Sequence, residues 1–400
     1  MKPHLDHALD PRAVLIFLAI LAGGLFYMAY SIYSDVSATG GGPTTILPFL
    51  LLGVAMVIAL GFEFVNGFHD TANAVATVIY THALPAQGAV VWSGCWNLLG
   101  VLASSGAVAF GIVSLLPVEL ILQVGSSAGY AMVFAALMRG RDGASGVDWD
   151  QVVKIGEALL FSPLFSFALS AVLLLLMKFI VRAPQLYQAP TTNATPPLWI
   201  RGLLVLTCTL VSFFHGSNDG QKGMGLIMLI LIGVVPTAYA LNRAPPVGHT
   251  DAFIAAAHNA SKSRRGPRRR IQRDRRSAPG RDRLHPRAPD LGGHLSVARS
   301  AGEADQRLGY GSVAKTPLDK VQNVRNDMYL ASEALRVLSK DKESELSAEE
   351  KRQIGEFKKQ LDYATKFIPL WVKVCVAIAL GLGTMILNPA VALADYGSRS

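Results

Sequence analysis

The chain contains several uninterrupted apolar runs of about twenty residues, the length that an α-helix needs to cross the hydrocarbon core of a bilayer. These runs cover residues 13–33, 46–65, 158–181, 223–241 and 367–386. Only 16% of the 400 residues are charged, whereas a soluble domain carries about a quarter. The strands of a membrane β-barrel alternate in hydrophobicity over about ten residues, and these runs are apolar on all faces. The sequence therefore predicts an all-α fold, a polytopic transmembrane helical bundle.

Changes in composition divide the chain into four predicted parts. Residues 1–242 form a transmembrane region. Residues 243–308 are rich in Arg and Pro and have almost no apolar periodicity, so a disordered loop is expected there. Residues 309–366 place apolar side chains at helical spacing among charges, which predicts a soluble helical part of the same aqueous loop. Residues 367–400 form the last transmembrane segment and a short tail.

Charge and cysteine content exclude several classes of protein. The net charge of +9 comes mostly from Arg residues in 243–307, outside every apolar run, so it does not by itself indicate nucleic-acid binding. Basic residues near the N-terminus and in the large loop favour the cytoplasmic side for both. Cys95, Cys208 and Cys375 lie in apolar segments without metal-site spacing, so neither a disulfide framework nor a metal site is expected.

Two copies of a polar motif interrupt the apolar sequence. The first reads FVNGFHDTANA from Phe64, and the second reads FFHGSNDGQKG from Phe213. At an offset of 149 residues, Asp70 aligns with Asp219 and the motif glycines also align. Internal repeats of this kind are typical of secondary transporters, whose substrate sites lie near the middle of the membrane.

The residue types in the motif indicate ion-coupled transport of an anion. Gly67 and Gly216 are expected to let the helices break, which would expose N–H groups that bind anions. A carboxylate at the centre of a membrane helix costs at least about 2.5–3.5 kcal/mol, so Asp70 and Asp219 should face protein or water and bind a cation or relay protons. Glu63, one turn before Gly67, is a further candidate for a cation or proton.

The other polar side chains of the two copies are predicted to bind the anion, and His69 or His215 to exchange protons. The predicted substrate-binding residues are Asn66, His69, Asp70, Asn73, His215, Asn218, Asp219, Gln221 and Lys222. The residues predicted for cation or proton coupling are Glu63, Asp70 and Asp219. Hydrogen bonding between membrane helices would explain a single Asn or His, and Asn97 is assigned to such packing. A duplicated motif with an Asp in each copy exceeds what packing requires.

These motifs resemble a known family. FVNGFHDTANAVATVIYTHALPA and HGSNDGQKGMGLIMLILIGVVPTAYALN are similar to the two signature repeats of the inorganic phosphate transporter (PiT) family, in its bacterial low-affinity branch. The resemblance implies an inner-membrane permease with inverted repeats and broken or re-entrant helices. It also implies import of phosphate or metal–phosphate by proton symport, with sodium used in other branches. By position, the family's phosphate and cation contacts would fall on Asp70, Asn73, Asn218 and Asp219.

The chain also departs from the family pattern. Family members carry a Ser/Thr–His element in each repeat, and neither element is present here. The sequence passes almost directly from residues 130–134 to 140–143, where relatives have an additional span, so an internal deletion is expected. The stretch 245–300 lacks family character, which favours a shifted reading frame, and the chain is expected to be truncated after Ile386. A transport-inactive truncated family member is therefore an alternative.

Two other classes of protein are alternatives. One is a membrane-anchored scaffold whose basic loop binds nucleic acid or anionic lipid. The other is an intramembrane hydrolase that uses His69 and Asp70, but no nucleophile or metal spacing accompanies them. The prediction is an inorganic phosphate transporter of the bacterial inner membrane and not an enzyme. Its expected partners are phosphate, the bilayer and a coupling proton or sodium ion, with a divalent metal as co-transported cargo, no nucleic acid, and no cofactor; a homo-oligomer is compatible with the sequence.

Overall fold

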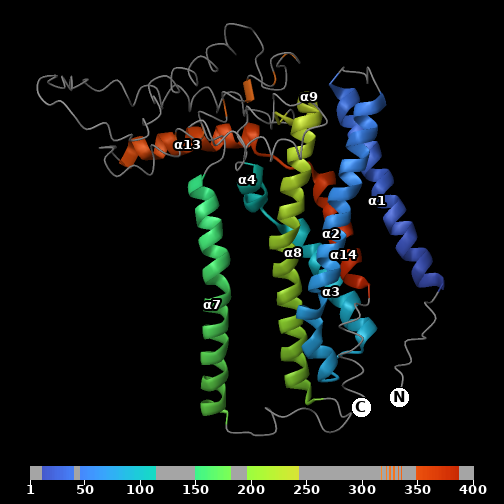
Figure 1. Ribbon diagram of the computed structural model, residues 1–400, viewed down its shortest axis with the longest axis vertical. Helices are drawn as coiled ribbons and strands as arrows, with labels where there is room; N and C mark the ends of the chain where they lie inside the picture. The colour runs from blue at the N-terminus through green and yellow to red at the C-terminus, as the bar shows by residue number, and fades with distance from the viewer. Residues whose placement is uncertain are drawn as a thin grey trace, which may run out of the picture. The chain divides into compact units, whose positions relative to one another are not determined.

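The computed structural model describes residues 11–39, 46–113, 149–181, 196–242, 317 and 348–386, with a few single residues between 321 and 335. All regular structure in these segments is α-helical (Figure 1). The helices are α1 (Pro11–Ala38), α2 (Ile46–Tyr80), α3 (Ala86–Ala103), α4 (Ala107–Val113), α7 (Trp149–Ile180), α8 (Leu198–Val234), α9 (Pro236–Tyr239), α13 (Ala348–Thr365) and α14 (Leu370–Met385).

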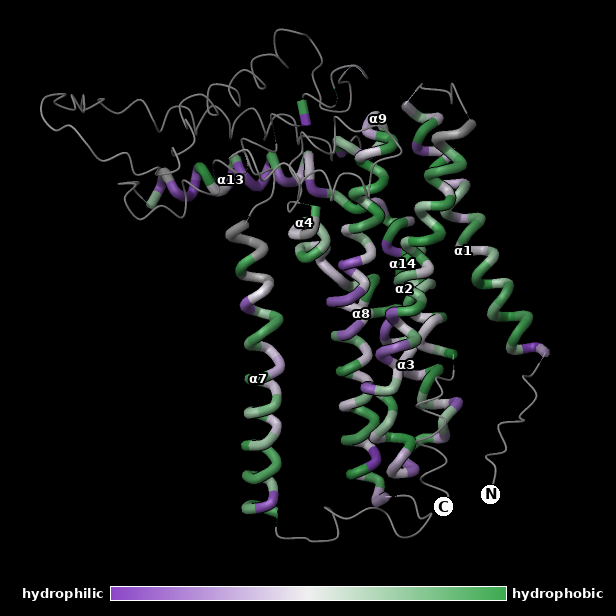
Figure 2. Tube along the Cα trace, viewed as in Figure 1, coloured by the Kyte–Doolittle hydropathy of each residue, from purple (hydrophilic) through white to green (hydrophobic). Residues whose placement is uncertain are grey.

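Long apolar helices confirm the predicted transmembrane bundle. Among the described residues, α1, α2, α7 and α8 are each long and apolar enough to cross a membrane, and the pair α13 and α14 would add a fifth span if counted as one. The span of α7 buries no residue in the protein, so its side chains are available to lipid. Figure 2 shows hydrophilic residues midway along α8, between hydrophobic stretches.

Helices α2, α3, α8 and α14 pack together around the polar motifs. Glycines bring the backbones of these helices into direct contact. A Cβ atom on Gly67 of α2 would collide with the carbonyl oxygen of Leu380 in α14, and one on Gly383 of α14 would collide with that of Phe64 in α2. Close backbone approach through glycine is a common way to pack helices in membranes, because lipid tails leave apolar side chains little to gain from each other.

The same arrangement recurs between α3 and α8. A Cβ atom on Gly216 of α8 would collide with the carbonyl oxygen of Asn97 in α3, and one on Gly100 of α3 would collide with that of Phe213 in α8. Gly216 and Phe213 are the motif counterparts of Gly67 and Phe64. On the partner helices, the carbonyl that meets the motif glycine belongs to Asn97 in α3 and to Leu380 in α14. Gly100 and Gly383 lie three residues after these carbonyls, so Asn97 corresponds to Leu380. The repeat in the sequence is therefore also a repeat in packing, and each motif helix packs on the helix that follows the other copy.

The expectation that Gly67 and Gly216 break their helices is wrong. Helices α2 and α8 run without interruption through both motifs. The missing side chain of each glycine is used for contact with a neighbouring helix rather than for an unusual backbone conformation. A broken helix does occur between α3 and α4, where Gly106 has a φ of 80°, a left-handed conformation that favours glycine.

A second compact unit comprises residues 36–42 and 235–367. Its described part contains α9 and the amphipathic helix α13, whose Phe357 and Leu361 are buried. Burial would raise the pKa of Asp362, but hydrogen bonds from Lys358, Ser332 and Lys366 more than offset this effect, so the pKa is lowered. The predicted loop 243–308 lies outside the described residues, and the division into four parts stays a prediction.

Candidate functional site

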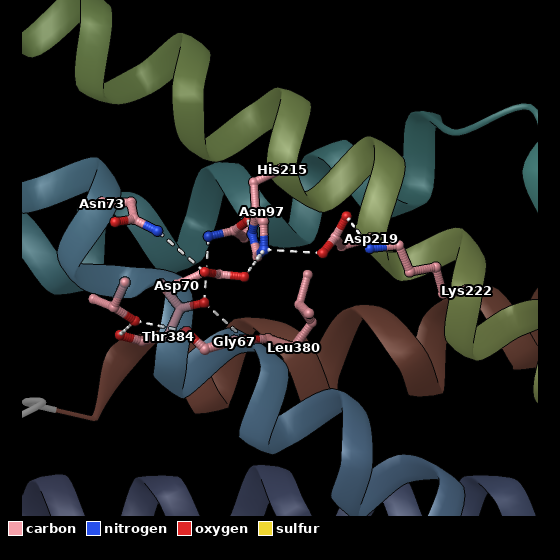
Figure 3. Close-up of polar contacts among 10 residues, drawn as sticks. Gly67, Asp70, Asn73, Asn97, His215, Asp219, Lys222, Leu380 and Thr384 are labelled. Atoms are coloured by element: carbon pink, nitrogen blue, oxygen red, sulfur yellow. Dashed lines mark hydrogen bonds and ion pairs between the residues drawn. The ribbon is translucent and has the colours of Figure 1, made fainter. Parts of the chain in front are cut away.

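The two motif copies meet at His215, which lies between their aspartates (Figure 3). The imidazole Nε2 of His215 is 3.1 Å from Oδ2 of Asp70 on α2 and 3.6 Å from Oδ2 of Asp219 on its own helix α8. Residues 215 and 219 are four apart on a continuous helix, so their side chains leave the same face. The close packing of α2 and α8 brings Asp70 to that face.

Each aspartate has a second partner within its own motif. The ammonium of Lys222 is 2.9 Å from Oδ1 of Asp219, and the amide Nδ2 of Asn73 donates a hydrogen bond of 3.1 Å to Oδ1 of Asp70. The side chains become more exposed toward the edges of the group: 17% for His215, 20% for Asp219, 36% for Asp70 and 53% for Lys222. We call Asp70, Asn73, His215, Asp219 and Lys222 the motif cluster.

Two buried side chains from other helices support the motif cluster from the opposite side of the imidazole. Nδ1 of His215 is 2.8 Å from Oδ1 of Asn97 on α3, and Nδ2 of Asn97 donates to Oγ1 of Thr384 on α14 at 3.3 Å. The hydroxyl of Thr71 on α2 donates to the Gly67 carbonyl at 2.7 Å and also lies 3.1 Å from the backbone oxygen of Thr384. All four packed helices therefore contribute to the polar centre.

Glu63 lies apart from the motif cluster in a closed position between α2 and α8. Its side chain is fully buried against Gly223, where an added Cβ atom would collide with the carboxyl group. Neighbouring polar groups are the Asn66 amide and the Gly223 N–H, yet neither carboxyl oxygen has a hydrogen-bond partner of normal geometry among the described residues. Asp219 and Lys222 are the charged groups that act on it.

The structure places the remaining predicted residues elsewhere. His69 is exposed and packs edge-on against Phe68 with ring centroids 5.9 Å apart, and Asn218 is exposed on α8. Gln221 is buried and holds α4 in place: its Oε1 accepts from the Val108 N–H at 2.9 Å, and its Nε2 donates to the Ser217 carbonyl at 2.7 Å. No finding tests the function of these residues, and their roles stay predictions.

The charges of the motif cluster favour a cation over a lone anion. Two carboxylates face one lysine and one histidine, so the group has no surplus of positive charge with which to hold phosphate alone. The ligand atoms of Asp70, His215 and Asp219 lie within 4.8 Å of one another, which is close enough to hold one cation. The motif cluster can therefore accept a cation, or phosphate accompanied by one.

Sequence reasoning assigned Asn97 to packing and did not single out Thr384. Asn97 contacts His215 across 118 residues of sequence, and Thr384 contacts Asn97 across 287 residues. Neither belongs to a repeated pattern in the sequence. An uncommon amide in an apolar span was the only available signal for Asn97. Lys373 of α14 was also missed; its ammonium donates to the Ser104 carbonyl at the end of α3, 2.9 Å away.

Comparison with known proteins gives consistent results. A model of the phosphate transporter family matches residues 66–139 and 121–394. The low-affinity inorganic phosphate transporter PitA of Escherichia coli K12 is 31% identical over 394 aligned residues, covering 84% of this chain and 78% of PitA. PitB of the same strain is 29% identical, with 84% and 78% covered. The low-affinity inorganic phosphate transporter of Buchnera aphidicola subsp. Acyrthosiphon pisum is 28% identical, with 84% and 77% covered.

No solved structure shows significant similarity to the chain. The family match covers more than half of the sequence and includes the second motif copy and all of the first copy from residue 66 onward. Its members are named as transporters, which confirms the expectation that the chain is not an enzyme. The long apolar helices and the two motif copies thus have a common explanation, and the chain belongs to the phosphate transporter family.

Proposed function

We propose that this chain imports inorganic phosphate across the bacterial inner membrane by proton symport, with a divalent cation accompanying the phosphate. The observation that carries the proposal is the meeting of both motif copies at His215, between Asp70 and Asp219. The named function of the bacterial relatives supports phosphate as the substrate.

The charge balance supports a cation as part of the cargo. Phosphate carries one or two negative charges near neutral pH, and the carboxylates of Asp70 and Asp219 would repel it. A divalent cation that binds both carboxylates would convert this repulsion into attraction. Oxygen-rich sites with carboxylates suit hard cations such as Mg²⁺ and Ca²⁺, and an added imidazole also suits Mn²⁺ or Zn²⁺.

Glu63 is the group that we assign to proton coupling. A charged carboxylate without a hydrogen-bond donor is costly in a buried position, so binding and release of a proton there requires the packing of α2 and α8 to change. Asp219 and Lys222 are the charged groups that face it, and Asp219 also belongs to the motif cluster. A change of ligand at Asp219 would therefore alter the electrostatic field at Glu63.

The test is uptake of radiolabelled phosphate by cells that lack their own phosphate permeases. We expect uptake by cells expressing this chain, stimulation by an inward proton gradient, and loss when a protonophore collapses it. Removal of divalent cations by a chelator should lower uptake, and radioactive manganese or calcium should enter together with phosphate. Uptake that follows a sodium gradient instead would contradict proton coupling, and no uptake despite good membrane expression would favour a transport-inactive family member.

Replacing Glu63 with Gln should separate coupling from transport. Gln has the same size but cannot take up and release a proton, so proton-driven accumulation should fall by about tenfold or more, while exchange of internal for external phosphate stays within about twofold. Both rates are measured in membrane vesicles with an imposed pH gradient. Glu157→Gln on the exposed surface of α7 is the matched control. Equal loss of accumulation and exchange would show that Glu63 has no separate role in coupling.

A further inference from the structure

We infer that Asn97, held in orientation by Thr384, is a positioning residue for transport: it determines which ring nitrogen of His215 carries the hydrogen, so that the Nε2 lone pair faces the two aspartates. The inference rests on the proposed function, because it assigns the motif cluster a role in transport. A chain of hydrogen bonds runs from α14 through α3 to α8, and the direction of each bond follows from its donor and acceptor groups.

The chain begins at Thr384, whose hydroxyl has one hydrogen to donate. That hydrogen is used in a bond of 2.9 Å to the backbone carbonyl of Leu380, one turn earlier in α14. Toward Asn97 the Thr384 oxygen can therefore only accept. The amide nitrogen Nδ2 of Asn97 must point at Thr384, where the separation is 3.3 Å.

This orientation leaves the Asn97 oxygen facing His215. Oδ1 of Asn97 is 2.8 Å from Nδ1 of His215, and an amide oxygen can only accept a hydrogen bond. Nδ1 must therefore carry a hydrogen, since a lone pair on Nδ1 would place two acceptors against each other at that distance. When His215 is neutral, the lone pair of Nε2 then faces Asp70 and Asp219. Without a cation this lone pair would lie 3.1 Å from a carboxylate oxygen, another acceptor, so the arrangement suits the site with the proposed cation between the three groups.

Burial makes this preference strong. Asn97 is 2% exposed and Thr384 is fully buried, so water offers little competition for their hydrogen bonds. The backbone oxygen of Asn97 also lies directly against Gly216, the residue after His215. Contact between the two backbones fixes the separation of α3 and α8 at the height of the imidazole.

The repeat in packing argues against a purely structural role for Asn97. Its counterpart in the α2 and α14 pair is Leu380, and those two helices approach as closely without an amide at this position. An apolar residue thus satisfies the packing geometry. The amide of Asn97 occurs in the α3 and α8 pair, where the motif contains His215. The aligned residue in the first motif copy is Asn66.

The experiment is a double-mutant cycle on phosphate uptake. Asn97→Leu alone, which restores the residue found in the other pair, should lower uptake by about tenfold or more, with normal membrane expression. In a His215→Gln background the same change should have almost no further effect, because its consequence passes through the imidazole. Ser93→Ala is the control, since it removes a buried hydrogen bond of 2.8 Å to Ser212 between the same helices and should change uptake by less than about twofold. Full additivity of the Asn97 and His215 losses would overturn the inference.

A measurement independent of transport accompanies the cycle. Nitrogen NMR is recorded on ¹⁵N-histidine protein in lipid nanodiscs with Mg²⁺ present, and His215 is assigned by loss of its signal in His215→Gln. It should show the Nδ1–H tautomer in the wild type and a mixture in Asn97→Leu. Thr384→Val should also mix the tautomers. The Nε2–H tautomer in the wild type would overturn the inference. If the wild type transports no phosphate, the proposed function fails. The NMR result still tests whether Asn97 sets the tautomer of His215.

Discussion

Uptake of phosphate is expected to fall by about 100-fold or more when Asp70 is replaced with Asn. Asn matches Asp in shape and keeps one oxygen that can accept a hydrogen bond from Asn73. What it loses is the negative charge that faces Nε2 of His215 at 3.1 Å and that would attract the cation carried with phosphate. Because Asp70 is 36% exposed, water screens part of this effect, and a cost of about 3 kcal/mol, or about two orders of magnitude in rate, is expected.

The measurement is initial uptake of labelled phosphate over a range of divalent cation concentrations. A higher cation concentration should recover part of the uptake of the variant, because the weakened site still retains Asp219 and His215. Asp35→Asn on α1 is the control of identical chemistry: Asp35 accepts a hydrogen bond from Trp371 and is not part of the motif cluster. Near-normal uptake by Asp70→Asn would remove the motif cluster from the transport mechanism.

The sequence predicts the membrane bundle and the family because both depend on features that are local in the chain. An apolar run reports its environment through composition alone, and the repeated Asp motif can be found by aligning the chain with itself. The contacts from Thr384 to Asn97 and from Asn97 to His215 depend instead on which helices become neighbours. Two single polar residues in separate apolar spans carry no pattern that would pair them.

His69 and Asn218 were predicted to bind substrate together with the motif aspartates, a prediction that assumed broken helices. On a continuous helix, residues four and seven apart share a face, so His215, Asp219 and Lys222 point together. His69 and Asn218 each precede the motif aspartate by one residue and turn about 100° away from it, and both are exposed. On unbroken helices, this periodicity alone separates these two side chains from the motif cluster.

The motif glycines were predicted correctly as special positions but for the wrong physical reason. Glycine permits unusual backbone angles, and it also permits two helices to touch. The local sequence is the same in both cases. Only the position of the neighbouring helix decides between them, and here α3 and α14 supply carbonyl groups that lie against Gly216 and Gly67.

Replacing Gly216 with Ala is therefore expected to abolish uptake and to lower the stability of the bundle. The new methyl group would overlap the Asn97 carbonyl, with the Asn97 Cα only 2.8 Å away, and neither backbone atom can rotate aside as a side chain would. Overpacking of this kind costs about 1–3 kcal/mol. Moving α3 away to relieve it would also withdraw Asn97 from His215, so function should be lost even where the protein still folds.

Gly202→Ala in the same helix is the matched control, because no described atom lies within 4 Å of the position of its new Cβ. Alanine favours helix over glycine by about 0.5–1 kcal/mol, so this control should be neutral or slightly stabilising. Thermal unfolding of the purified protein in detergent and phosphate uptake in cells are measured for both variants. If Gly216→Ala behaved like Gly202→Ala in both measurements, the close contact between α3 and α8 at this position would not exist in the membrane.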